Sequence, residues 1–185
     1  MDTMAHDALA IEGMVRSAAT GDEAAFARLI AAHHASMARV AYVICGDAET
    51  TQDAVQTAWS IAWRRLGSLR DPSSVRPWLI AIAANEARKV AGRERRDRVV
   101  DISTTLAPSD VDNPTDSVDL VDLRRALSAL RPEERQLLAM RYAAGLDSSE
   151  ISAQLGLSAS GVRSRLARLL DRLRSDLDIP PEVSR

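Results

Sequence analysis

One segment near the C-terminal end restricts the fold of this 185-residue chain more than any other, LDSSEISAQLGLSASGVRSRLAR at residues 146–168. Asp147 and Glu150 have the spacing of a capping box, which starts a helix. Apolar residues then recur at the i, i+4 spacing of a buried helical face. Gly156 suits the left-handed residue that ends such a helix. The segment therefore begins with a short helix and a tight turn.

A second helix is expected directly after this turn, with Ser158 as its N-cap and Val162 and Leu166 on its inward face. Its outward face carries Ser160, Arg163, Ser164, Ala167 and Arg168. A short helix, a three-residue turn containing Gly, and a helix with an exposed Arg/Ser face form the arrangement that docks into the major groove of DNA. The segment is therefore interpreted as a DNA-binding helix-turn-helix.

The distribution of charge favours this interpretation over an ordinary pair of packed helices with a solvated basic face. Residues 159–175 contain five arginines and one aspartate, a net charge of about +4, whereas the whole chain has a net charge of −2. Positive charge gathered on one helix of an otherwise acidic chain is the electrostatic footprint expected of phosphate contacts.

Composition predicts helices throughout and excludes several functions. Aromatic residues make up only 3% of the chain, Gly and Pro are few, and no strand pattern occurs in residues 1–98. Cys45 is the single cysteine, no apolar run reaches membrane-spanning length, and the N-terminus is acidic, which together favour a cytoplasmic protein without membrane insertion.

No paired carboxylates, nucleophile–base group or phosphate loop stands at usable spacing, so neither enzyme activity nor a cofactor is expected. The adjacent His33 and His34 point apart on a helix, so no metal site is expected either.

The periodicity predicts an all-α fold of two small helical domains joined by a flexible acidic linker. The first domain is expected to hold three long helices, with a loop at residues 66–74 and a third helix that ends near Gly92. Residues 101–122 contain six aspartates and no basic residue, so they are interpreted as linker. The expected boundaries are a leader that is partly helical at 1–20, a first domain at 21–98, a linker at 99–119, a second domain at 120–177 and a tail at 178–185.

With both domains in view, the chain resembles the extracytoplasmic-function (ECF) sigma factors, the compact class of bacterial RNA polymerase sigma factors. In the first domain the resemblance rests on GDEAAF at 21–26, DAVQ at 53–56 and RPWLIAIAAN at 76–85. In the second domain it rests on ALRPEER at 129–135 and on the helix-turn-helix. Each motif alone is moderately specific, but their order and spacing make the combination strong.

The resemblance implies that each domain has its own task in initiating transcription. The first domain, matching sigma region 2, would bind the clamp coiled coil of core polymerase through Asp53, Gln56, Thr57, Ser60 and Arg64. It would also read and open the promoter −10 element through Leu69, Arg70, Ser73, Ser74, Arg76, Asn85, Arg88 and Lys89. The second domain, matching region 4, would read the −35 element through Ser158, Ser160, Arg163, Ser164, Arg165, Ala167 and Arg168.

The resemblance also implies partners and leaves alternatives open. The expected partners are core polymerase, promoter DNA and an anti-sigma factor. A LuxR-type regulator shares the helix-turn-helix pattern, but such regulators usually carry an α/β sensor domain ahead of it. A sigma-like decoy that only binds an anti-sigma factor should lack the basic face that this chain retains.

Overall fold

The computed structural model describes residues 2–100 and 118–177, and within these ranges it contains helices and turns but no strand. The prediction of an all-α chain is therefore confirmed. The predicted linker lies mostly outside the described residues, as does the predicted tail. The elements in chain order are α1 (Asp2–Ala19), α2 (Glu23–Cys45), α3 (Ala48–Arg65), the 3₁₀ turns η1 (Leu66–Ser68) and η2 (Pro72–Ser74), α4 (Val75–Val100), α5 (Val118–Ala129), α6 (Pro132–Leu138), the π-helical turn η4 (Ala139–Ala143), α7 (Ser148–Leu155) and α8 (Ala159–Asp176).

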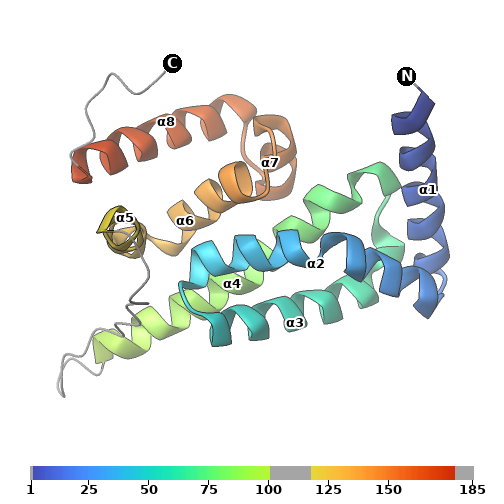
Figure 1. Cartoon of the computed structure of the whole chain (residues 1–185), viewed down its shortest axis with the longest axis horizontal. Helices are drawn as coiled ribbons and strands as arrows, with labels where there is room; N and C mark the ends of the chain where they lie inside the picture. The colour runs from blue at the N-terminus through green and yellow to red at the C-terminus, as the bar shows by residue number, and fades with distance from the viewer. Residues whose placement is uncertain (1, 101–117, 178–185) are drawn as a thin grey trace.

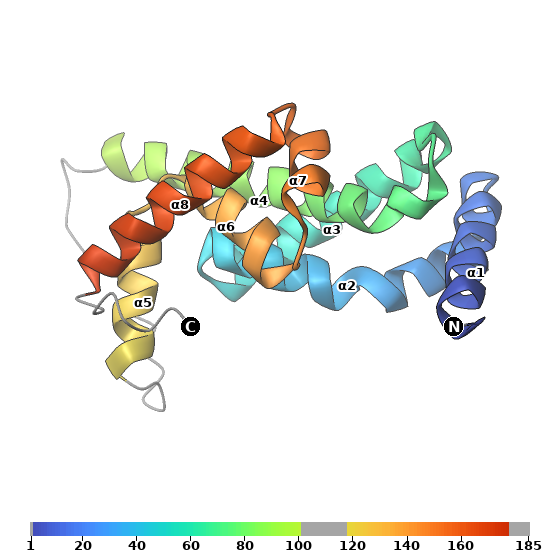
Figure 2. The same cartoon turned by 90° about the horizontal axis from the view of Figure 1, so that it is seen from above.

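Helices α2, α3 and α4 pack together into the N-terminal unit, and α1 crosses one end of it beside η1 and η2 (Figures 1 and 2). Asp22 and Asp47 cap α2 and α3, each accepting a hydrogen bond from a backbone N–H three residues on. The centre is filled by large side chains that are almost fully buried, among them Leu29, Met37 and Leu79. Burying each of these stabilises the fold by about 1.5–3 kcal/mol.

Helix α4 is longer than predicted, because it continues through Gly92 to Val100. A single glycine inside a helix costs only about 1 kcal/mol relative to alanine. The residues that follow, 93–98, are Arg, Glu and Asp without proline, so nothing in the sequence interrupts the helix. The prediction that this helix ends near Gly92 is wrong for that reason.

The C-terminal unit is built from α5 to α8, with the π-helical turn between α6 and the helix-turn-helix. Asp147 accepts hydrogen bonds from the backbone N–H groups of Ser149 and Glu150, and Glu150 accepts one from the Asp147 N–H at 2.7 Å. Gly156 ends α7 with a φ of 65°, and the Ser158 hydroxyl caps α8. The predicted capping box, glycine turn and second cap are therefore confirmed.

The two units lie against each other. Helices α2 and α4 of the N-terminal unit pack against α6 and η4, and α4 also contacts α7 (Figures 1 and 2). Helix α4 is therefore covered by both units, and Leu79, Ile80, Ala83, Ala84 and Ala87 are all buried along it. The alanines allow close approach of neighbouring helices on both sides of α4.

Replacing Gly156 with alanine tests the turn that sets the angle between α7 and α8. The left-handed conformation costs an L-residue about 1–2 kcal/mol, and open space around the position leaves no other penalty. We expect Gly156→Ala to lower the free energy of unfolding by about 1 kcal/mol, measured by urea denaturation.

The matched control is Gly92→Ala, which places the same methyl group in open space inside a helix. It should stabilise the chain by about 0.5–1 kcal/mol. Equal effects of the two variants would contradict the role assigned to the left-handed turn.

Candidate nucleic-acid interface

Helix α8 separates an apolar side from an exposed polar side. Val162, Leu166, Leu169 and Leu173 are buried against the rest of the C-terminal unit. The side chains predicted to face DNA all lie on the solvent-exposed side: Ser158, Ser160, Arg163, Ser164, Arg165, Ala167 and Arg168. The Arg168 Nε donates to the carbonyl of Ser164 one turn earlier, at 3.3 Å. The helix therefore presents a continuous basic and polar surface at its N-terminal half.

An ion pair fixes α8 to α6 behind this surface. Glu134 accepts hydrogen bonds from Arg172 Nη2 at 2.9 Å, from the Arg131 N–H at 2.9 Å and from Arg131 Nη2 at 3.3 Å. Burial raises the pKa of the Glu134 carboxyl, but the hydrogen bonds from Arg172 and Arg131 outweigh that effect and hold it at about 2. Glu134 therefore stays ionised and helps to set the orientation of the exposed face of α8.

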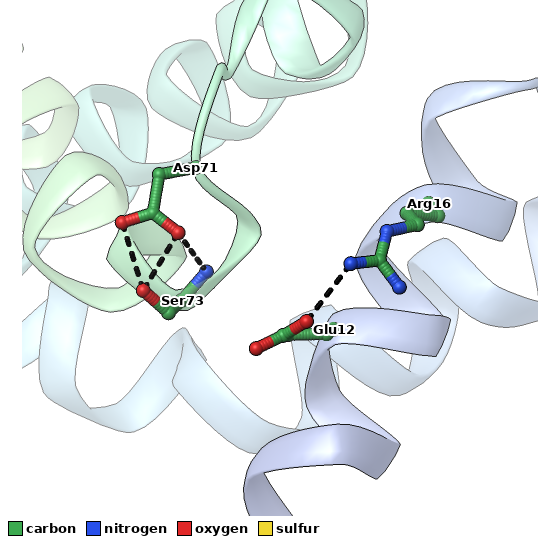
Figure 3. A network of polar contacts seen from close by, with 4 residues as sticks. All are labelled: Glu12, Arg16, Asp71 and Ser73. Atoms are coloured by element: carbon green, nitrogen blue, oxygen red, sulfur yellow. Dashed lines mark hydrogen bonds and ion pairs between the residues drawn. The ribbon is translucent and has the colours of Figure 1, made fainter.

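The loop between α3 and α4 is held by a carboxylate that the sequence interpretation passed over. Asp71 accepts hydrogen bonds from the N–H of Ser73 at 3.0 Å and from the hydroxyl of Ser73 at 2.7 Å (Figure 3). It also accepts one from the hydroxyl of Ser74 at 2.8 Å. The Ser73 and Ser74 hydroxyls lower the pKa of Asp71 by hydrogen bonding to it. The signal was present as Asp-Pro-Ser-Ser, since an Asp side chain commonly folds the backbone two residues on. Asp71 thus gives this exposed loop a defined shape.

The remaining loop residues differ in their surroundings. Leu69 is half-buried against the core and Arg70 is exposed. Helix α1 contacts the same loop, and its Glu12–Arg16 pair, at 2.9 Å, lies beside Asp71 and Ser73 (Figure 3). The loop is therefore supported by the core on one side and by α1 on the other.

Three of the −10 candidates on α4 are bonded to the C-terminal unit. The Asn85 Oδ1 accepts from Gln136 Nε2 at 2.8 Å, and Arg88 lies 3.5 Å from the Glu133 carboxylate. The Arg76 guanidinium donates to the carbonyl of Ala144. Lys89 instead pairs with Glu86 of the same helix. The predicted −10 residues thus form two groups. Those in the loop at 69–74 have no partner in the C-terminal unit among the contacts described, whereas Arg76, Asn85 and Arg88 on α4 are bonded to that unit.

The predicted polymerase-binding side chains share the exposed face of α3, and beside them runs an apolar groove between α2 and α3. Asp53, Gln56, Thr57, Ser60 and Arg64 are all exposed. The groove has a volume of about 1230 Å³ and includes Phe26, Tyr42, Trp59 and Trp63 in its lining, together with Gln56 and Ser60 from the predicted face.

The aromatic lining of this groove is a feature that the sequence interpretation missed. Trp63 is 39% exposed and Tyr42 41% exposed, although both are large apolar side chains. Phe26 meets Trp59 and Trp63 edge-on, with centroid distances of 5.6 and 4.7 Å. The spacing of Trp59 and Trp63, one helical turn apart, was the available signal. Exposed aromatic surface that lines a groove is a candidate contact site for another molecule.

Two side chains expected to have no functional role are placed inside the fold. His33 is half-buried, and burial and the nearby Arg76 charge lower its pKa. Cys45 is buried, with its Sγ 3.8 Å from the carbonyl of Ala87. Within residues 2–100 and 118–177 no group of three or more His, Cys, Asp or Glu side chains could hold a metal ion. None of the described helices is long and apolar enough to cross a membrane.

Comparison with known proteins identifies the family of this chain. The family model for sigma-70 region 2 matches residues 29–97, and that for sigma-70 region 4 matches residues 120–173. The chain is 30% identical over 166 residues to the ECF RNA polymerase sigma factor SigL of Mycobacterium tuberculosis, covering 87% of this chain and 94% of SigL. It is also 32% identical over 169 residues to the probable RNA polymerase sigma factor RfaY of Xanthomonas campestris, covering 86% of this chain and 42% of RfaY.

The fold agrees with a solved structure of this kind. The structure of CnrH in complex with the cytosolic domain of CnrY superposes with a TM-score of 0.70 at 26% identity, covering 91% of this chain and 97% of CnrH. The chain belongs to the ECF family of RNA polymerase sigma factors. Its helical N-terminal unit, matched by region 2, separates it from LuxR-type regulators with an α/β sensor domain.

Changing Glu134 to glutamine tests the attachment of α8. The carboxyl has a folded pKa of about 2 against an ordinary value of 4.5, so its contribution to stability is complete above about pH 4.5 and is lost as the pH falls toward 2. We expect Glu134→Gln to lower the free energy of unfolding by about 1 kcal/mol at pH 7, because Arg172 is half-exposed and solvent screens the pair.

The measurement is urea denaturation of both proteins at pH 7 and at pH 3. The difference between them should shrink at pH 3. A difference that stays constant with pH would contradict the ionised pair, and Glu133→Gln, at a more exposed carboxylate, serves as the control with little effect at either pH.

Proposed function

We propose that this sigma factor reads the −35 element as duplex DNA with α8 and opens the −10 element with the loop at residues 69–74 and the adjoining α4. The observation that carries the proposal is the exposed Arg/Ser side of α8 in a helix-turn-helix whose caps and turn are all formed. Polymerase performs the chemistry, and the sigma factor itself makes no bond. We place its action in the cytoplasm, where polymerase and promoter are.

Recognition of the −35 element is assigned to side chains near the start of α8. An arginine such as Arg163 can donate two hydrogen bonds to guanine O6 and N7, which discriminates by about 1–3 kcal/mol. Ala167 offers an apolar contact to a thymine methyl group. Free N–H groups at the helix start, around Ser158 and Ser160, suit a DNA phosphate.

Opening of the −10 element needs single-stranded bases held outside the stack and basic groups that follow the backbone. The loop shaped by Asp71 supplies a fixed surface with Leu69, Arg70, Ser73 and Ser74. We assign the contact with an unstacked base to Asn85, because a carboxamide both donates and accepts hydrogen bonds. Arg76, Arg88 and Lys89 are assigned to the DNA backbone.

Binding to core polymerase is assigned to the exposed face of α3. Charged and polar groups placed without repetition, such as Asp53, Gln56 and Arg64, set the register and orientation of a protein contact. The solved structure of CnrH holds the cytosolic domain of CnrY. We infer that this chain also has a sequestering partner, an anti-sigma factor, for which the aromatic groove between α2 and α3 is an apolar surface suited to a helix.

The direct test is transcription in vitro with purified bacterial core polymerase on a library of promoters, and Arg163→Ala refines it. We expect this variant to reduce promoter-specific transcription roughly 5- to 100-fold, since one bidentate base contact is lost, while binding to core in a pull-down is unchanged. Arg174→Ala, which removes the same charge near the end of α8, is the matched control and should retain most of the activity. Equal loss of transcription and of core binding in Arg163→Ala would contradict the assignment.

The complementary variant carries Asp53→Ala and Gln56→Ala together. We expect its affinity for core polymerase to fall roughly 5- to 30-fold, because two interface side chains that each cost about 0.5–1 kcal/mol when truncated weaken binding by about 1–2 kcal/mol together. The same full-length protein should still shift a −35 duplex in a gel assay, since α8 is untouched. Unchanged affinity for core polymerase would show that this face of α3 does not bind it.

A further inference from the structure

Helix α6 presents two side chains to α4 at matching spacing. Glu133 and Gln136 are three residues apart on α6, and their partners Arg88 and Asn85 are three residues apart on α4. Residues at this spacing lie on one face of a helix. The two pairs therefore form one continuous contact rather than two isolated ones.

The α6 side chains in this contact offer α4 the same kinds of hydrogen-bonding group as a nucleic-acid strand. Gln136 Nε2 donates to Asn85 Oδ1, which is the bond that an exocyclic amino group of adenine or cytosine would make to a carboxamide. The carboxylate of Glu133 faces the guanidinium of Arg88, as a DNA phosphate would. Asn85 and Arg88, two of the groups that the proposed function assigns to −10 DNA, thus already have partners of the same hydrogen-bonding type on α6.

The bond between Gln136 and Asn85 lies inside the contact between the two units, because Gln136 is buried. Its side chain is 4% exposed, one of the few buried polar residues among the described ones. A buried carboxamide is stable only when it is hydrogen-bonded, and Asn85 supplies that bond. Arg76 adds a third bond across the same boundary, to the carbonyl of Ala144. While α6 stays in place, a base that would donate to the Oδ1 of Asn85 along the same direction must displace Gln136.

We propose that α6 is a built-in competitor of the −10 strand, with Gln136 in place of the base and Glu133 in place of a phosphate. The inference rests on the proposed function of Asn85. The closed arrangement keeps the free chain from binding single-stranded DNA, and the C-terminal unit must leave α4 before the −10 element is read. Movement of the C-terminal unit toward a −35 element would thus uncover the −10 site.

Competition by α6 should make the free chain bind single-stranded DNA more weakly than its open form does. If only a fraction f of molecules is open, the apparent dissociation constant for single-stranded DNA is the intrinsic value divided by f. Removing one buried hydrogen bond across the contact should raise f roughly tenfold. Removing the half-exposed ion pair should raise it only about twofold.

The experiment uses the full chain without polymerase and a fluorescent single strand of mixed sequence, about 12 nucleotides long, within the length that single-strand-binding grooves commonly cover. Gln136→Ala should bind this strand roughly tenfold more tightly than the unchanged chain, and Glu133→Ala about twofold more tightly. Gln52→Ala, the same substitution at an exposed position on α3, is the matched control and should have no effect. Because Gln136 is buried, circular dichroism checks that its variant is folded, and Glu133→Ala tests the contact from a more exposed position.

A second readout follows the separation of the two units directly. Dyes on cysteines introduced at the exposed positions Ala35 and Ser175, with Cys45→Ala, report energy transfer between α2 and α8. Gln136→Ala should lower this transfer. Unchanged transfer and unchanged affinity in both α6 variants would overturn the proposal.

Adding Asn85→Ala to Gln136→Ala should cancel the gain in affinity, whereas a gain that persists would show that α6 does not compete at Asn85. A failure of the proposed function is seen separately, because Asn85→Ala alone would then leave promoter opening by polymerase intact.

Discussion

Helix α4 packs between two sets of helices, and both units of the fold are assembled around it. Ala83, Ala84 and Ala87 are fully buried, and their small side chains let α2 and α3 approach one side while α6 and α7 approach the other. A larger residue at these positions would force at least one neighbour away, since protein interiors are packed without spare volume. The same helix carries Arg76, Asn85 and Arg88, and its packing brings all three into contact with polar groups of the C-terminal unit.

The distribution of charge follows from this arrangement. Arg163, Arg165 and Arg168 are exposed on α8, whereas Arg172 on the same helix is paired with Glu134 of α6. On α4, in contrast, Arg88 lies opposite Glu133. The two regions predicted to touch the promoter therefore differ: the −35 surface is preformed and open, and the α4 part of the −10 surface is covered.

The helix-turn-helix could be predicted because its determinants are local. Asp147, Gly156 and Ser158 each act on backbone groups within three or four residues, so their roles are readable from spacing alone. The contact between Gln136 and Asn85 joins residues 51 positions apart, and no periodicity encodes it. For the same reason the packing of α4 against the C-terminal unit was not predicted, because its contacts with α6 and α7 join residues far apart in the sequence. The groove escaped prediction because Trp59 and Trp63, one helical turn apart, fit a core pattern equally well. The role of Asp71 escaped it because Asp-Pro-Ser-Ser was interpreted only as a loop, although its spacing fits the observed hydrogen bonds.

We propose that one surface of α4 binds the C-terminal unit in the free chain and the promoter in the open complex. The decisive measurement is an electron cryomicroscopy map of the chain with core polymerase and an opened promoter. We expect Asn85 to contact an unstacked −10 base, with α6 withdrawn and the Arg163 side of α8 in the −35 major groove. A map in which Gln136 still donates to Asn85 while the −10 strand is open would contradict it.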